Sequence, residues 1–119
     1  MKGPIIAFLY PRCTSCAKAK TDLLRSGAAF QERHIRKDPP TRTELAELAS
    51  MHPHGARAFL SQRSVRFREL GLAGREFAEE ELLDLLAREP NLLRRPIISD
   101  GSSVVVGYDR PALQALLAR

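Results

Sequence analysis

The chain has 119 residues, 44% hydrophobic and 28% charged, with a formal net charge of +5 and a pI near 9.8. This length and composition predict one soluble globular domain with a genuine core. They exclude a membrane-spanning protein, because no apolar run approaches the roughly 18 residues that a span needs. The basic balance favours an acidic partner, or else a solvated surface. A stand-alone reader of nucleic acid is disfavoured, because dense Lys/Arg tracts and stacking aromatic residues are lacking.

An apolar run over residues 4–10 predicts a first strand that is buried on both faces. The run is too short for a signal peptide and no small-residue cleavage site follows it, so we expect a cytoplasmic protein. Directly after the run, Cys13-Thr14-Ser15-Cys16 contains both cysteines of the chain. In the cytoplasm a cysteine pair is more often catalytic or redox-sensing than structural.

A helical pattern over residues 14–26 follows, and Gly27 is a natural stop for it. The apolar face of this helix contains Cys16, Ala19 and Leu23, at spacings i, i+3 and i+7. Cys13 lies at the start of the helix and outside this stripe. We therefore expect Cys13 to be presented at the helix end and Cys16 to be turned inward.

A second strand is expected over residues 28–35, which completes a β-α-β unit. Residues 41–93 then predict a helical insert without a strong strand pattern, and Thr41 with Glu44 forms a capping box at its start. Helices within the insert are expected at about 41–51, 56–60, 65–70 and 77–89, the last of them ended by Pro90.

After the insert, the pattern predicts a third strand over 94–99, a hairpin turn at Asp100-Gly101, a return strand over 103–106 and a last helix from Arg110. The order β-α-β, helical insert, β-β-α predicts an α/β protein with a thioredoxin-like core. We expect a single domain over residues 1–119, with the core at about 4–38 and 94–118 and the insert at about 41–93. In such folds the proline that begins the third strand is cis and lies beside the cysteines, and Pro96 is the candidate.

A Cys-x-x-Cys motif between a strand and a helix indicates redox chemistry. The attacking species is a thiolate, and Cys13 at a helix N-terminus gains from unpaired N–H groups and the helix dipole. Arg12 beside it in the sequence and Arg95 from the third strand would favour the anion further. Cys16, more buried, would stay a thiol until it attacks a mixed disulfide at Cys13. We therefore assign Cys13 as nucleophile or sensor and Cys16 as the resolving partner.

Two other interpretations of the cysteines stay open. Both residues could be small buried core residues. They could also form half of a zinc site that His52 and His54 complete, although His-x-His is not the usual spacing of a zinc finger. No thiol reaction here requires a histidine base, and we expect neither a metal nor a cofactor.

The chain resembles the ArsC/Spx family, and above all its Spx branch of redox-sensing transcription regulators, in Pro11 to Cys16, Arg63-Ser64, Leu92 to Ile98 and Gly107-Tyr108. The resemblance extends from about Ile5 to Leu117 and implies the thioredoxin-like core with a helical insert. It also implies a thiol–disulfide switch at Cys13 and Cys16. Arg95, which precedes the candidate cis-proline, occupies the place of an arginine that supports the oxidised state.

The resemblance further implies a partner. Spx-type regulators bind the C-terminal domain of the RNA polymerase alpha subunit through a surface that includes a glycine of the insert, and Gly55 matches that glycine. Otherwise Gly55 would be only a helix stop. Regulators of this kind carry a C-terminal tail for proteolytic control, whereas this sequence ends at Arg119. We expect either a different turnover or one of the shorter ArsC-like redox proteins.

The alternative is an enzyme, a thiol–disulfide oxidoreductase or arsenate reductase-like protein that uses Cys13 as nucleophile with a thioredoxin or glutathione system as reductant. Arsenate reductases share the first cysteine and the Arg-Pro start of the third strand, and they hold the oxyanion with further arginines. One of these follows the hairpin, where this chain has Gly107-Tyr108. Arg12, Arg63 and Arg95 are the candidates for an anion site, which leaves the set for arsenate incomplete.

Overall fold

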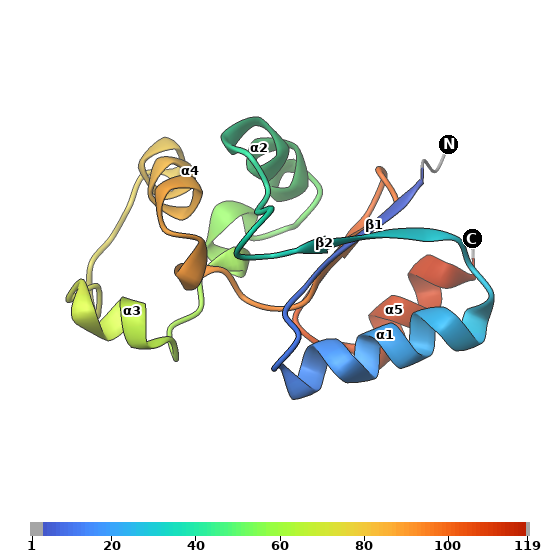
Figure 1. Ribbon diagram of the computed structural model, residues 1–119. Helices are drawn as coiled ribbons and strands as arrows, with labels where there is room; N and C mark the ends of the chain where they lie inside the picture. The colour runs from blue at the N-terminus through green and yellow to red at the C-terminus, as the bar shows by residue number, and fades with distance from the viewer. Residues whose placement is uncertain (1–3, 119) are drawn as a thin grey trace. The chain divides into compact units, whose positions relative to one another are not determined.

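Figure 1 shows the computed structural model, which describes residues 4–118. Contacts divide the chain into two compact units. The first, the sheet unit, contains the two ends of the chain up to Pro39 and from Arg95, and the second, the helical unit, contains Pro40–Arg94. Among the described residues, no helix is long and apolar enough to cross a membrane.

The sheet unit is built on four strands within the described residues, in the order β2-β1-β3-β4. The central strand β1 (Ile5–Leu9) pairs in parallel with β2 (Phe30–His34) and antiparallel with β3 (Ile97–Ser99). At the edge, β4 (Val104–Val106) pairs antiparallel with β3. This register brings the end of β1, which leads to Cys13, close to the start of β3.

Helices α1 (Thr14–Ser26) and α5 (Arg110–Leu117) lie side by side on one face of the sheet (Figure 1). One apolar cluster joins them to it, made of Ile5, Ala7, Leu9, Cys16, Ala19, Leu23, Ile98, Val105, Leu113 and Leu116. Alternate residues of β1 share this face because the side chains of a strand alternate between its two faces. Cys16 is therefore a core residue of the sheet unit.

The helix predicted over residues 14–26 forms over those residues, with Cys13 as its N-cap and Gly27 in the left-handed region at φ 75° after its last turn. All four strands are shorter than predicted. β1 lacks one residue at each end, β2 covers Phe30–His34, β3 begins at Ile97 and β4 begins at Val104. For β3 the reason is Pro96, which has no N–H to donate to a ladder. Its carbonyl still accepts a hydrogen bond from the N–H of Gly107 at 2.8 Å.

The helical unit contains α2 (Arg42–Ser50), the 3₁₀ helix η1 (Gly55–Phe59), α3 (Val65–Glu69), α4 (Glu79–Arg88) and the 3₁₀ helix η2 (Pro90–Leu92). The predicted capping box of Thr41 and Glu44 is present at the start of α2. Pro90 differs from the prediction, because it begins η2 in addition to following α4. Proline suits a first helical position, where its missing N–H would have no helical partner.

Apolar packing and charged contacts hold the helical unit together. Its most deeply buried large side chains are Leu45, Phe59, Leu82, Leu86 and Leu92. Arg42 on α2 contacts Glu80 and Asp84 on α4 at 2.9 and 2.8 Å. Such exposed ion pairs contribute little because solvent screens them, so the buried leucines and Phe59 are the main source of stability.

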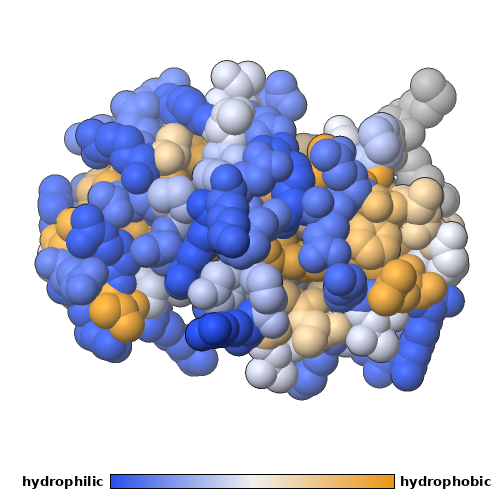
Figure 2. Space-filling model, viewed as in Figure 1, coloured by the Kyte–Doolittle hydropathy of each residue, from blue (hydrophilic) through white to orange (hydrophobic). Residues whose placement is uncertain are grey.

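The face seen in Figure 2 is mostly hydrophilic, and apolar residues interrupt it in several places. Among the described residues, the large hydrophobic side chains that are exposed are Leu24 on α1, at 63%, and Val65 on α3, at 60%. Single exposed hydrophobic residues are normal on soluble proteins. Neither residue therefore marks a binding surface by itself.

Candidate functional site

Cys13 begins α1, and its sulfur takes the place that an oxygen usually has at a helix start. Its Sγ accepts a hydrogen bond from the N–H of Cys16 at 3.3 Å, while its own N–H donates to the carbonyl of Tyr10 at 3.2 Å. The side chain is half-buried. N-cap positions favour negative charge, because backbone N–H groups without helical partners point at them.

The environment of Cys13 favours the thiolate. Partial burial raises the pKa of Cys13, but hydrogen bonds from the side chain and backbone of Cys16 outweigh it, together with the positive charge of Arg95. The net effect lowers the pKa of Cys13 below its ordinary value. The thiolate is the nucleophilic form of cysteine, so this residue is prepared for attack on an oxidant or a disulfide.

Cys16 has the opposite character. Its side chain is 2% exposed, and its Sγ accepts a hydrogen bond from the N–H of Tyr10 at 3.4 Å. Burial, followed by the hydrogen bond to Cys13, raises the pKa of Cys16 to about 12. Both cysteines are free thiols in this structure. The pair thus combines an accessible sulfur that ionises easily with a buried one that keeps its proton, as nucleophile and resolving cysteine require.

Arg95 and Pro96 approach the same place from the start of β3. Ile97 pairs with Phe8 in the antiparallel ladder, so the residues before Ile97 lie towards the end of β1 that leads to Cys13. The Arg95–Pro96 peptide bond is cis. The positive charge of Arg95 lowers the pKa of Cys13 and opposes the rise at Cys16.

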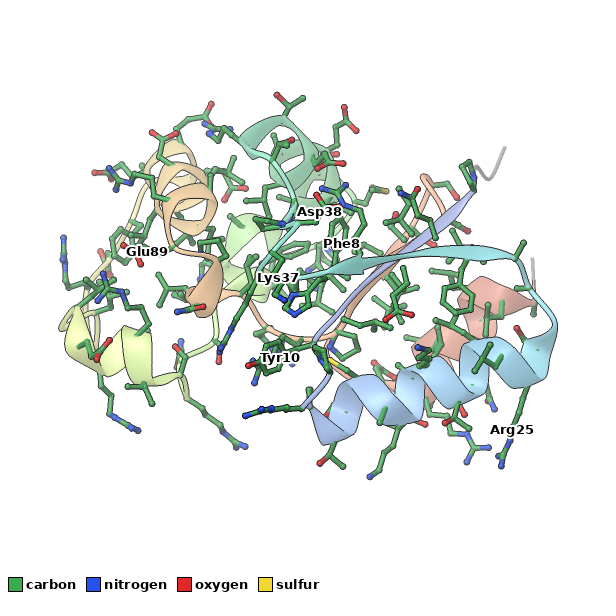
Figure 3. All side chains as sticks on the ribbon, viewed as in Figure 1. Phe8, Tyr10, Arg25, Lys37, Asp38 and Glu89 are labelled. Carbon is green, nitrogen blue, oxygen red and sulfur yellow. The ribbon has the colours of Figure 1, made fainter. Side chains whose placement is uncertain are left out.

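Two further residues complete the arrangement, and neither was assigned a role from the sequence. Tyr10 lies between the end of β1 and the start of α1 (Figure 3), and the guanidinium carbon of Arg95 is 4.9 Å from its ring centroid. The guanidinium carbon of Arg36 is 4.3 Å from the same centroid, and its Nη1 donates to the Tyr10 hydroxyl at 3.2 Å. We call these five residues the cysteine site: Tyr10, Cys13, Cys16, Arg36 and Arg95.

Only the strand topology could have indicated from the sequence that Arg36 lies near Tyr10. Tyr10 follows β1 and Arg36 follows β2, and these strands run in parallel with Leu9 paired to His34. Residues that follow two parallel neighbours meet at the same edge of the sheet, where α/β proteins often bind ligands. Both strands were predicted from the sequence, but no sequence pattern indicates that these two side chains meet.

The remaining sequence candidates lie in different places. Arg12 is exposed beside Cys13 in the sheet unit, whereas Arg63, also exposed, and Gly55 belong to the helical unit. Gly55 has φ 61°, and a Cβ there would lie 2.8 Å from Oε2 of Glu79. That carboxylate accepts the N–H of Ala56 at 3.0 Å. A side chain at Gly55 is therefore opposed both by the backbone and by Glu79.

An arsenate reductase would have an arginine after the hairpin. In this chain that position is occupied by Gly107-Tyr108, and Tyr108 forms a hydrogen bond to α1. The hydroxyl of Tyr108 donates to Oδ2 of Asp22 on α1 at 2.6 Å. This hydrogen bond, together with burial, raises the pKa of Tyr108. The position therefore joins the loop before α5 to α1.

His52 and His54 contact each other in the helical unit, with ring centroids 5.7 Å apart, and His52 also contacts the ring of Phe59. Burial and the nearby charges of His54 and Arg94 lower the pKa of His52. Within residues 4–118, no group of three or more His, Cys, Asp or Glu side chains is arranged to hold a metal ion. The zinc interpretation gains no support from this geometry.

Comparison with known proteins gives a consistent result. The sequence matches the ArsC family over residues 8–116. It is 37% identical over 115 residues to the global transcriptional regulator Spx of Streptococcus pyogenes serotype M1, covering 97% of this chain and 86% of that protein. It is 39% identical over 109 residues to the regulatory protein MgsR of Bacillus subtilis (strain 168), covering 92% of this chain and 86% of that protein.

Solved structures agree on the fold. An ArsC family related protein from Bacteroides fragilis matches with a TM-score of 0.89 at 30% identity, covering 98% of both chains. The arsenate reductase from Vibrio cholerae matches with a TM-score of 0.77 at 19% identity, covering 99% of this chain and 98% of that one, and shows the fold alone. The predicted α/β, thioredoxin-like class is thus confirmed. On its match from residue 8 to residue 116 and on these relatives, the chain belongs to the ArsC family.

Proposed function

We propose that the chain is a redox-responsive transcription regulator of the Spx type. Cys13 and Cys16 form its thiol–disulfide switch, and the state of the switch sets the affinity for the C-terminal domain of the RNA polymerase alpha subunit. The observation that carries the proposal is the asymmetric cysteine pair at the start of α1. The similarity to a global transcriptional regulator and to a regulatory protein supports the regulatory part of the proposal. Such a regulator would act in the cytoplasm.

The switch closes in two steps when the oxidant is a disulfide. The Cys13 thiolate attacks one sulfur of the disulfide, forms a mixed disulfide and expels a thiolate. Cys16 then loses its proton to that thiolate or to solvent, attacks Sγ of Cys13 and expels the second thiolate. Two protein thiols are oxidised, one disulfide is reduced, and a thioredoxin or glutathione system would reverse the reaction.

Closing the switch changes the first turn of α1. The negative charge of Cys13 disappears from beside Arg95, and the hydrogen bond that the N–H of Cys16 donates to Cys13 Sγ loses its charged acceptor. The thiol sulfur that accepts the N–H of Tyr10 becomes part of a disulfide. These changes are local, and they occur where the helix is capped, so the helix start is the element that responds.

We place the polymerase contact on the helical unit at Gly55. The left-handed backbone at φ 61° and the nearby carboxylate of Glu79 both favour the absence of a side chain there. A side chain introduced at Gly55 would therefore disturb the turn and the Glu79 contact on the surface proposed for the partner. Gly74, which is exposed at φ 75° with no atom within 4 Å of an added Cβ, offers a matched control in the same unit.

The test is a binding measurement with the purified C-terminal domain of the alpha subunit. We expect at least about a fivefold difference in affinity between oxidised and reduced protein, and no redox dependence in Cys13→Ser. Gly55→Arg should abolish binding while Gly74→Arg retains it, with circular dichroism to confirm that both variants fold. Absence of binding in both redox states would overturn the proposal.

An enzyme of the thiol–disulfide oxidoreductase or arsenate reductase-like class is the second candidate, because an accessible cysteine of lowered pKa is also what such an enzyme needs. Arg12 and Arg95 of the sheet unit would then hold an anion. Turnover of arsenate or of a disulfide with a thioredoxin or glutathione system, lost in Cys13→Ser, would establish it. Rates at background with both substrates would remove it.

A further inference from the structure

The ring of Tyr10 holds two arginines. Arg36 and Arg95 have their guanidinium carbons 4.3 and 4.9 Å from its centroid, and Arg36 also donates to its hydroxyl. The backbone of the same residue contacts both cysteines, through its carbonyl to Cys13 and its N–H to Cys16. His34 touches the ring edge-on, with centroids 5.6 Å apart. Tyr10 therefore fixes two cations relative to the reactive sulfur.

No carboxylate of the described residues pairs with these cations. Among the described residues, Arg12, Arg36 and Arg95 form no ion pair, whereas acidic groups of the sheet unit are engaged elsewhere. Glu32 pairs with Lys20, Asp38 with Arg33, and Asp22 accepts from Tyr108. The two other acids, Asp100 and Asp109, accept backbone N–H groups of their own turn and helix.

The sheet unit contains more basic than acidic residues, which is consistent with arginines that have no acidic partner. Over residues 4–39 and 95–118 nine Lys and Arg residues face five Asp and Glu residues, whereas in residues 40–94 eight face nine. The net positive charge of the protein therefore belongs to the unit that contains the cysteines. An aromatic ring attracts a guanidinium group without neutralising it, unlike a carboxylate. An arginine held by an aromatic ring can therefore still attract an external anion.

We propose that Arg36 is a specificity-determining residue of the switch, held by Tyr10, and that with Arg95 it makes Cys13 react preferentially with negatively charged disulfides. The inference rests on the proposed redox function and names the class of oxidant. Arg95 acts on the Cys13 sulfur directly. Arg36 acts on the incoming anion, from its place on the Tyr10 ring. Arg12, exposed beside Cys13, adds to the same field.

The reaction is the two-step exchange given above, with the charge placed on the substituents of the disulfide. The Cys13 thiolate attacks one sulfur of the anionic disulfide RSSR, and the first RS⁻ leaves. Cys16 then attacks Sγ of Cys13 in the mixed disulfide and displaces the second RS⁻. Selectivity arises in the first step, because the negative groups of R approach while both arginines are charged. Electrostatic attraction of this kind raises association rates by about 10- to 1000-fold and weakens as salt screens it.

The test compares three disulfides of similar size with the reduced full-length chain at low ionic strength: dithiodipropionate, which carries two carboxylates, neutral hydroxyethyl disulfide, and cystamine, which carries two ammonium groups. Mass spectrometry follows loss of the Cys13 thiol. Each rate is divided by the rate of a small neutral model thiol with the same disulfide, because the leaving thiols differ in pKa. On this scale we expect wild type to prefer the dicarboxylate over the diamine by about tenfold. Arg36→Gln should cut the dicarboxylate rate by about threefold or more, change the neutral rate less than twofold, and raise the diamine rate.

Matched variants separate charge from structure. Arg25→Gln removes the same charge at the other end of α1, about 18 Å along the helix from Cys13, and should change no rate (Figure 3). Arg36→Lys should restore part of the preference, and Tyr10→Leu should lose it because both arginines lose their support. An equal fall with all three disulfides in Arg36→Gln, or an equal effect of Arg25→Gln, would overturn the inference.

The outcomes also distinguish the inference from the function on which it rests. A Cys13–Cys16 disulfide that forms with hydroxyethyl disulfide, without any preference for the anionic probe, would refute the selectivity and leave the switch in place. Failure of all three probes to form that disulfide would refute both.

Discussion

The N–H of Cys16 donates to Sγ of Cys13 at 3.3 Å, so the second cysteine of the motif helps to hold the first as an anion. The same pair has opposite pKa shifts, lowered at Cys13 and raised at Cys16. The structure thereby favours the thiolate at Cys13 and the neutral thiol at Cys16. This relationship has consequences for stability as well as for reactivity.

The first prediction concerns the pH dependence of folding under reducing conditions. Because the pKa of Cys13 is lowered on folding, its stabilising effect grows as pH rises towards the unfolded thiol value of about 8.5 and is lost as pH falls. The pKa of Cys16 is raised to about 12 in the folded protein. Above about pH 8.5 the unfolded chain ionises this thiol while the folded protein does not, so the free energy of unfolding decreases as pH rises.

Urea unfolding at a series of pH values measures both effects. The stability of wild type relative to Cys13→Ser should increase from about pH 6 to pH 8.5, and its stability relative to Cys16→Ala should fall by about 2 kcal/mol by pH 10. Comparison with each variant cancels the titration of groups outside the cysteine pair. The remaining cysteine still contributes, because the hydrogen bond between the two thiols shifts both pKa values. Parallel curves for wild type and Cys16→Ala above pH 8.5 would contradict the assignment of Cys16 as a buried thiol.

Arg95→Gln should raise the pKa of Cys13, because it removes the positive charge that favours the thiolate. Alkylation of Cys13 by iodoacetamide at pH 7 should slow by about threefold, which corresponds to a modest change in thiolate fraction. Rates measured across pH give the pKa directly. Arg25→Gln, at the far end of α1, is the control, and an unchanged pKa in Arg95→Gln would mean that Arg95 acts on bound anions alone.

Tyr108→Phe removes the hydrogen bond to Asp22 that joins the loop before α5 to α1. We expect a measurable loss in the free energy of unfolding, since the acceptor is a carboxylate. Urea unfolding of Tyr108→Phe, Asp22→Asn and the double variant isolates the pair. A coupling energy below about 0.3 kcal/mol would show that the contact contributes nothing measurable.

Gly55→Ala should destabilise the protein more than Gly74→Ala. Both glycines have positive φ, at 61° and 75°, so each alanine meets the same backbone strain of about 1 kcal/mol. Near Gly55 the new Cβ also displaces the Glu79 carboxylate from the N–H of Ala56, which costs about 1 kcal/mol more. Thermal unfolding compares them. Equal losses in the two variants would show that Glu79 moves aside freely.

The elements with strong local patterns were predicted well from the sequence. The helix over residues 14–26 has an apolar stripe and a glycine stop, and the capping box at Thr41 has its Glu44 partner, so both formed as expected. The start of β3 was misplaced because strand propensity at residues 94–96 does not show which N–H groups find a ladder partner.

Of the two arginines of the cysteine site, one could be predicted from the sequence and the other could not. Arg95 could be named because it precedes a proline that such folds place near the motif. Arg36 is 26 residues from Tyr10, and their contact depends on the register of β1 with β2 and on the side chain chosen at each strand end. The bond from Tyr108 to Asp22 spans 86 residues and has no sequence pattern at all. Contacts of this kind follow from tertiary geometry.

The backbone N–H of Tyr10 donates to the Cys16 sulfur at 3.4 Å, so this amide can report the oxidation state of that sulfur. When Cys16 changes from thiol to disulfide, the acceptor of this amide changes its charge distribution and its position. The ¹⁵N–¹H resonance of Tyr10 should therefore shift on oxidation and return on reduction, without any label on sulfur. In a spectrum recorded with the polymerase domain present, that one resonance would report the redox state while others report binding.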